Sequence, residues 1–170
     1  MKSKENLVFL GMMGSGKSSI GALVSKKLNI KFIDIDQEIE KKLGITILEI
    51  FQNNGEKYFR KIEEIITLKQ LKKNNTVISL GGGAFLNNKI KKEILENHLS
   101  FWLNWEINTL IKRIKNNQKR PLAHNLSEKK LKELIKKRSI IYSEAMYKIN
   151  CENLSKNEIV KSIINIYESN

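Results

Sequence analysis

The sequence predicts a three-layer α/β fold, in which a five-stranded parallel sheet is covered by helices on both faces. Helical periodicity, as in Phe59, Ile62 and Ile66, fills the intervals between five short runs of β-branched, apolar and aromatic residues. Strands that alternate with helices run parallel, because each crossover helix returns the chain to the same end of the sheet. The predicted strands are 6–10, 31–35, 76–80, 99–104 and 147–151.

The first predicted strand leads directly into a glycine-rich turn, Gly11-Met-Met-Gly-Ser-Gly-Lys-Ser18, which satisfies the pattern G-x-x-x-x-G-K-[ST]. A helical pattern follows from Ile20, and this order of strand, turn and helix is what a phosphate-binding loop requires. Backbone N–H groups in such a turn point into one concavity, and the helix N-terminus adds its partial positive charge. We therefore expect a P-loop NTPase fold that binds ATP or GTP, with Lys17 on the β- and γ-phosphates and Ser18 on Mg²⁺.

Length and composition limit the classes to which the protein can belong. The 170 residues suffice for a single domain, 1–170, whose core needs no disulfide or metal. The single cysteine, Cys151, cannot form an intramolecular disulfide, which suits a reducing compartment. No apolar run has the length of a signal peptide's core or of a membrane span. We expect a cytoplasmic protein with no membrane partner.

The formal net charge of +13 raises the question of nucleic-acid binding. Most of this charge comes from lysines that are scattered along helical patterns and are not interleaved with aromatic residues. We therefore expect a solvated surface and no nucleic-acid partner. Arginine is scarce, and its planar group binds carboxylate or phosphate bidentately, so each arginine is a candidate ligand, with chance as the alternative for any one. The 31 basic residues include four arginines: Arg60, Arg113, Arg120 and Arg138.

Two aspartates occur at the end of the second predicted strand, in the run Phe32-Ile-Asp-Ile-Asp36. Strand alternation places Asp34 and Asp36 on one face, at the edge where open α/β sheets bind ligands. Two carboxylates there would serve a Mg²⁺ shell and a substrate hydroxyl. The alternative is that Asp36 caps the helix that follows.

Arg60 lies within a run of acidic residues at helical spacing, Glu56, Glu63 and Glu64. Carboxylates at these positions would hold its guanidinium in one orientation. The alternative is an ordinary salt-bridged surface, which contributes little to stability.

Three consecutive glycines, Gly81 to Gly83, follow the third predicted strand. Because glycine is entropically costly, the run indicates that the backbone approaches another group closely. A tight turn is the alternative, although one or two glycines would suffice for it.

Arg138 occupies a position on the apolar stripe of its predicted helix, between Ile135 and Tyr142. A charge that faces inward is costly unless it is paired, so either a buried ion pair or an anion site is expected there. The preceding segment, from Lys115 to Ser127, is polar, contains Pro121 and is typical of a mobile surface loop or lid.

Together, the motifs GMMGSGKS, FIDIDQEIE, IFQNNGEKYFRKIE, SLGGGAF, KRPL and KKRSIIYSEA resemble shikimate kinase in order and spacing over essentially the whole chain. The resemblance implies ATP-dependent phosphorylation of the 3-hydroxyl of shikimate to shikimate 3-phosphate, a step toward chorismate and aromatic amino acids. It also implies a fold of the nucleoside-monophosphate-kinase type with a mobile lid at about 113–127, and we expect a monomer.

The resemblance assigns roles residue by residue. The catalytic residues would be Lys17, Asp36 and Arg120, with Arg120 reaching the phosphates from the lid. Ser18 would ligate Mg²⁺, and Asp34 would support the metal through water. Arg113 would lie against the adenine. The other nucleotide-binding residues would be Gly14, Ser15, Gly16, Lys17, Ser18 and Ser19, and shikimate would be bound by Asp36, Arg60, Gly82 and Arg138.

Two other functions remain as alternatives. The first is a different small-molecule kinase with a P-loop, such as a gluconate or nucleotide kinase. A nucleotide acceptor would need a second phosphate site, whereas two aspartates for hydroxyls and two arginines for one carboxylate suit a polyol acid. The second is a non-catalytic nucleic-acid-binding protein, which leaves the aspartate pair and the inward Arg138 without a role.

Overall fold

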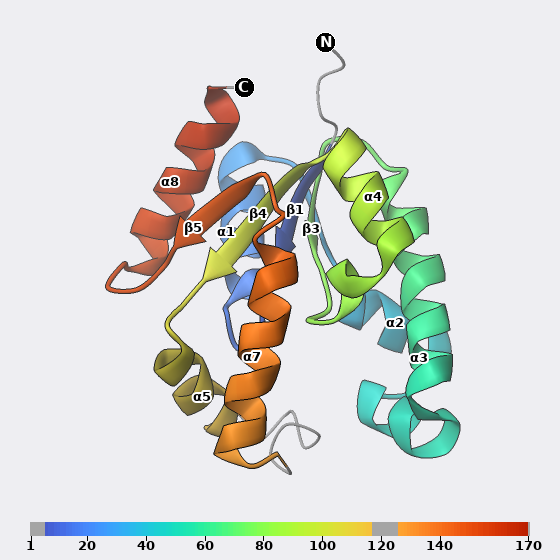
Figure 1. Cartoon of the computed structure of the whole chain (residues 1–170). Coiled ribbons are helices and arrows are strands. Elements are labelled where there is room, and N and C mark those ends of the chain that lie inside the picture. The colour runs from blue at the N-terminus through green and yellow to red at the C-terminus, as the bar shows by residue number, and fades with distance from the viewer. Residues whose placement is uncertain (1–5, 117–125, 170) are drawn as a thin grey trace.

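The computed structural model describes residues 6–116 and 126–169 (Figure 1). Within them, five parallel strands form one sheet in the order β2-β3-β1-β4-β5. The predicted parallel sheet is confirmed, and three of its strands end one residue earlier than expected. The strands are β1 (Asn6–Leu10), β2 (Lys31–Asp34), β3 (Thr76–Ser79), β4 (Leu99–Asn104) and β5 (Tyr147–Asn150).

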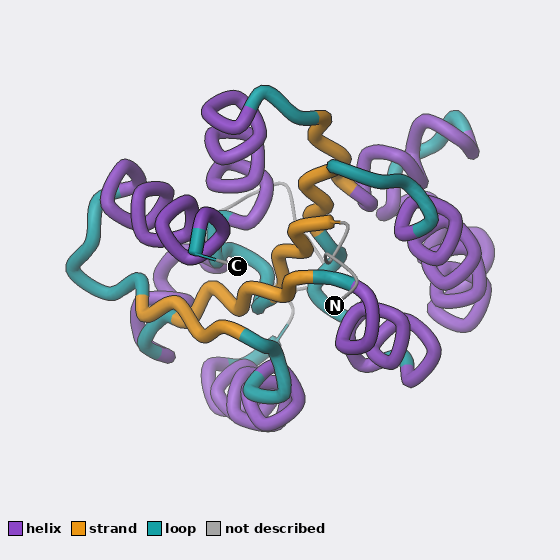
Figure 2. The backbone as a smooth tube through the Cα atoms, turned by 90° about the horizontal axis from the view of Figure 1, so that it is seen from above, coloured by secondary structure: helices purple, strands orange, loops and turns teal. Residues whose placement is uncertain are grey.

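Helices cover both faces of this sheet, which gives the three predicted layers (Figure 2). One face carries α1 (Lys17–Leu28) and α8 (Lys156–Glu168), whose buried residues join one hydrophobic cluster. The opposite face contributes a second cluster. Its elements are α2 (Ile35–Leu43), α3 (Ile47–Leu71), the short 3-10 helix η1 (Ala84–Leu86), α4 (Asn88–Asn97), α5 (Ile107–Lys115) and α7 (Glu128–Tyr142).

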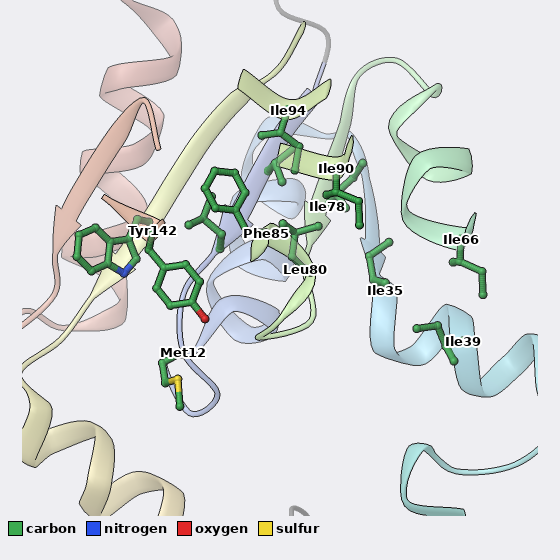
Figure 3. Packing of buried hydrophobic residues seen from close by; sticks show 14 of the residues in the cluster. Met12, Ile35, Ile39, Ile66, Ile78, Leu80, Phe85, Ile90, Ile94 and Tyr142 are labelled. Atoms are coloured by element: carbon green, nitrogen blue, oxygen red, sulfur yellow. The ribbon is translucent and has the colours of Figure 1, made fainter. Parts of the chain in front are cut away.

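The two clusters arise because strand residues alternate between the faces of the sheet. In β1, Leu7 and Phe9 point to the face of α1 and α8, whereas Val8 and Leu10 point to the other face. All four side chains are buried, as a strand in the centre of a parallel sheet requires. Figure 3 shows the second cluster, which extends to Tyr142 of α7.

Local sequence signals set the helix boundaries that matter for the site. The Asp34 carboxylate accepts a hydrogen bond from the Gln37 backbone N–H, so β2 ends and α2 begins at this residue. Thr46 and Glu49 form a capping box at the start of α3. Gly55, with φ of 78°, kinks α3 and separates its first two turns from the straight segment that carries Arg60.

In the part of the chain that the structure describes, no helix is both long enough and apolar enough to cross a lipid bilayer.

The close packing of α1 on the sheet predicts a specific sensitivity at Gly21. A β-carbon there would lie 2.7 Å from the Phe32 ring and 3.4 Å from Val77, so Gly21→Val forces α1 away from the sheet. We expect the free energy of unfolding to fall by about 1–3 kcal/mol. The control is Ala22→Val on the exposed side of α1, which should cost less than about 0.7 kcal/mol. Urea denaturation measures both, and equal losses would contradict this packing.

Candidate functional site

The phosphate-binding loop connects β1 to α1 at the C-terminal edge of the sheet. Gly14 and Gly16 have φ of 80° and 88°, a left-handed conformation that glycine adopts without strain. Gly16 is the N-cap of α1, and no side chain caps this helix. The first turn of α1 also lacks acidic residues, so its N–H groups and positive end are available for an anion.

Lys17 and Ser18 begin α1 and point to different partners. The Lys17 ammonium donates hydrogen bonds to the carbonyls of Gly11 and Met12, at 2.9 and 3.0 Å, within the loop. The Ser18 hydroxyl lies 2.5 Å from the Asp34 carboxylate at the end of β2. This hydroxyl and this carboxylate are hard oxygen donors of the kind that Mg²⁺ prefers.

Asp36 corrects the expectation from strand alternation. Because Asp34 caps α2, Asp36 lies in the first turn of that helix and not on the strand. The alternative that Asp36 caps this helix was therefore wrong, because the cap is Asp34. Asp36 still faces the sheet edge, since its Oδ1 lies 2.8 Å from the position that a β-carbon of Gly81 would take.

Arg60 is held by carboxylates, as its spacing predicted. It donates to Glu56 at 3.1 and 3.2 Å and to Glu63 at 2.7 Å. Glu56 is exposed, but the side chain of Glu63 is only 3% accessible, so this is not merely a surface pair. Glu64 does not join them, because it bonds Asn87, the N-cap of α4, and Lys89 within α4 instead.

The ionisation of this pair reflects its burial. Burial raises the pKa of Glu63 above its ordinary 4.5, and the nearby Asp36 carboxylate adds to the rise, whereas Arg60 and Arg138 oppose it. Burial acts to lower the pKa of Arg60, but the attraction of Glu63 and Glu56 outweighs it, so the pKa is raised. Arg60 therefore remains a cation, beside a carboxyl group that is costly to ionise.

The glycine run after β3 allows these groups to approach the backbone. A β-carbon at Gly81 would lie 2.5 Å from Glu63 Oε1, and one at Gly83 would lie 2.5 Å from an Arg60 nitrogen. A β-carbon at either position would force the neighbouring side-chain end to move, whereas the φ of Gly83, −107°, is one that any residue can adopt. Close approach, and not a special turn, therefore explains Gly81 and Gly83.

Arg138 reaches the same run from α7. One of its terminal nitrogens donates to the Gly82 carbonyl at 3.4 Å and lies 3.8 Å from the Met12 sulfur. Its buried Nε has no hydrogen-bond partner, and Glu63, the buried carboxyl group that Arg138 attracts, forms its ion pair with Arg60 instead. This arrangement favours the anion site over the buried ion pair.

Tyr142 was not a sequence-predicted site residue, although it lies one helical turn after Arg138. Its hydroxyl donates a hydrogen bond to the Gly82 carbonyl. Burial raises the pKa of Tyr142 to about 12, so the hydroxyl stays protonated and remains a donor at neutral pH. It thus helps to fix the glycine run in front of Arg138.

Arg113 and Arg120 belong to the predicted nucleotide side. Arg113 lies in the last turn of α5, with its guanidinium carbon 3.6 Å from the ring centroid of Trp105. Trp105 was missed by the sequence analysis, because no local pattern indicates its partners. Arg120 and most of the predicted lid lie outside the described residues, whereas Ser127 caps α7.

The chain is similar to known proteins over nearly its whole length. A family model for shikimate kinase matches residues 13–168. The shikimate kinase of Persephonella marina is 40% identical over 159 residues, which cover 94% of this chain and 96% of that protein.

Solved structures agree with this similarity. The shikimate kinase of Acinetobacter baumannii, solved in complex with shikimate, superimposes with a TM-score of 0.91 and 27% identity, covering 99% of this chain and 95% of that one. The shikimate kinase of Aquifex aeolicus gives a TM-score of 0.86 and 34% identity, with 96% of each chain covered.

The buried Glu63 predicts a pH-dependent stability. Because its pKa is raised in the folded state, the native protein binds this proton more tightly than the unfolded chain does. Native stability is therefore lost as the pH rises from about 4.5 through the raised pKa. Glu63→Gln removes this loss, so the wild type should become less stable relative to the variant as the pH rises.

Urea denaturation between pH 4.5 and 7.5 measures the difference in unfolding free energy. The control, Glu56→Gln, removes the exposed carboxylate that bonds the same guanidinium, and it measures at each pH what the loss of one ion pair with Arg60 costs. A wild type that gains stability over Glu63→Gln as the pH rises would refute the assigned direction.

Proposed function

This chain belongs to the shikimate kinase family, and we propose that it transfers the γ-phosphoryl group of ATP to the 3-hydroxyl of shikimate. One observation carries the proposal: the groups suited to the acceptor meet the phosphate-binding loop at the glycine run. A β-carbon at Gly82 would lie 3.4 Å from the Met13 nitrogen of the loop and 3.6 Å from Arg138. The groups that we assign to the acceptor therefore adjoin the loop that we assign to the donor, which supports a direct transfer.

The acceptor side suits a carboxylate that carries hydroxyl groups. Arg60 and Arg138 approach consecutive residues, Gly83 and Gly82, from two different helices. Two guanidinium groups at one place provide the parallel donors that a carboxylate accepts. Asp36, at the other end of the glycine run, supplies a carboxylate oxygen for the hydroxyls. This order matches an acid that is held at one end and reacts at the other.

The donor side is built by the loop and the first turn of α1. We assign the phosphates of ATP to Gly14, Gly16 and the residues that follow, and Lys17 turns from its loop carbonyls to the β- and γ-phosphates. Ser18 and Asp34 would hold Mg²⁺, the latter through water, since their oxygens are adjacent. Such a small protein ligand set suits Mg²⁺, which takes its other ligands from phosphate and water. Bound there, the ion would neutralise charge on the phosphate oxygens.

The reaction needs positioning more than covalent chemistry. Asp36 orients the attacking hydroxyl and accepts its proton as the bond to the γ-phosphorus forms, while the bond from that phosphorus to the bridging oxygen breaks and ADP leaves. Lys17 neutralises charge that spreads over the γ-phosphate oxygens. We assign the same role to Arg120, in the segment outside the described residues. Closure of a lid over the site would exclude water and prevent the hydrolysis of ATP.

We further propose a cytoplasmic monomer that has no nucleic-acid partner. The single cysteine, Cys151, is buried and free, which suits a reducing compartment. We assign the described arginines Arg60, Arg113 and Arg138 to the two substrates, and we expect the lysines to form a solvated surface. Membership of the family does not favour a gluconate or nucleotide kinase.

The proposal predicts that ADP release depends on shikimate. Purified protein with ATP and Mg²⁺ should release ADP rapidly when shikimate is added, and slowly with gluconate or a nucleoside monophosphate. Lys17→Ala should lower the rate by at least about a hundredfold, because it removes charge stabilisation of the transferred group. Lys27→Ala, on the exposed end of α1, is the control and should keep the wild-type rate. A coupled assay measures the release of ADP. Equal rates with gluconate and with shikimate would show that shikimate is not the specific acceptor.

A further inference from the structure

Trp105 connects the nucleotide side of the site to the phosphate-binding loop. It lies between β4 and α5, and its indole N–H donates a 2.9 Å hydrogen bond to the Ser15 carbonyl. Ser15 is buried within the loop, and 90 residues separate the two partners along the chain. This hydrogen bond fixes the plane of a half-buried indole beside the loop.

The indole in turn covers one face of the Arg113 guanidinium. The 3.6 Å between the guanidinium carbon and the ring centroid is the separation of two planar groups in stacking contact. Arg113 as a residue remains exposed, so its opposite face is open to a ligand. Its β-carbon lies 3.5 Å from the position of a Gly14 β-carbon, which shows that this turn of α5 also approaches the loop.

The other end of α5 is anchored separately. Glu106, the N-cap of α5, makes no side-chain cap of its own. Glu152, from the connection between β5 and α8, instead accepts hydrogen bonds from the Glu106 N–H at 3.2 Å and from the Thr109 hydroxyl at 2.8 Å. Glu152 therefore holds the start of the helix. Arg113 lies in the last turn, away from this anchor, and its guanidinium contacts Trp105, so we take Trp105 as the residue that sets the position of the guanidinium.

We propose that Trp105 is a positioning residue for the nucleotide, which holds the Arg113 guanidinium in one plane so that its open face stacks on the purine ring of ATP. The inference rests on the proposed function, because it takes ATP as the donor, and it keeps the contact between Arg113 and the adenine that the sequence predicts. Guanidinium groups stack on planar π systems, and a purine offers a large one. A side chain that is already ordered loses less entropy when the ligand binds.

Two substitutions separate the parts of the indole. Trp105→Leu removes both the ring face and the N–H donor, and it should raise KM for ATP about tenfold. Trp105→Phe keeps a ring face but loses the hydrogen bond to Ser15, so a smaller rise of about threefold is expected. KM for shikimate should stay at the wild-type value in both variants, because the acceptor groups lie on α2, α3 and α7.

A double-mutant cycle tests whether Trp105 acts through Arg113. Arg113→Ala should raise KM for ATP, and adding Trp105→Leu to it should give no further rise, because the guanidinium to be positioned is gone. The matched control is Lys148→Ala, which removes the cation at 5.1 Å from the other indole, Trp102, and should leave both KM values unchanged.

The outcomes separate this inference from the proposed function. If the wild type releases no ADP in response to shikimate, the proposed function fails and the inference fails with it. If the wild type is active, an unchanged KM for ATP in Trp105→Leu, equal rises in both KM values, or additive effects with Arg113→Ala overturn the inference alone. If Trp105→Leu does not fold, Trp105→Phe with Arg113→Ala completes the cycle, and additive effects there refute it.

Discussion

The acceptor side of the site depends on the absence of side chains at Gly81 and Gly83, the two ends of the glycine run Gly81 to Gly83. The run begins two residues after the last residue of β3, at the edge where the phosphate-binding loop also lies. Oxygen atoms of Asp36 and Glu63 lie within 2.8 Å of the position that one β-carbon would take, and the Arg60 guanidinium lies as close to another. Charged groups from α2 and α3 can therefore lie this close to one strand end because the backbone at Gly81 and Gly83 carries no side chain.

The close approach brings two carboxyl groups near one another, and the neighbouring arginines compensate part of their negative charge. Glu63 and Asp36 are carboxylates near one another, and Glu63 is almost fully buried. Arg60 lies in direct contact with Glu63, and Arg138 attracts it from a greater distance, so the charges partly compensate. Neither arginine has to be ordered from solution when a carboxylate arrives, because their positions are set by the fold. Such preorganisation lowers the cost of binding.

The sequence was sufficient for the features that local patterns control. Apolar runs and helical periodicity predicted the parallel sheet, and the acidic residues around Arg60 predicted its orientation. The position of Arg138 on an apolar stripe predicted that it faces inward. Asp36 was misplaced because a side-chain cap at Asp34 ended the strand earlier, and a hydrogen bond of that kind overrides alternation.

Contacts between distant segments were beyond the reach of sequence patterns. Trp105 meets Ser15 across 90 residues, and Tyr142 meets Gly82 across 60. Nothing in the residues that surround either aromatic distinguishes it from a core side chain. The roles of the site residues, including Arg120 outside the described part of the chain, stay predictions until they are measured.

The equilibrium affinity of Gly83→Ala for shikimate, measured by calorimetry without nucleotide, tests the central claim most directly. The backbone at Gly83 accepts alanine, but the new methyl group would overlap Arg60, which can move because its end is flexible. We expect the affinity to fall at least about tenfold, with the free energy of unfolding changed by less than about 1 kcal/mol. In an Arg60→Ala background the same change should have no further effect on affinity. A Gly83→Ala protein that binds shikimate as tightly as wild type would contradict the account.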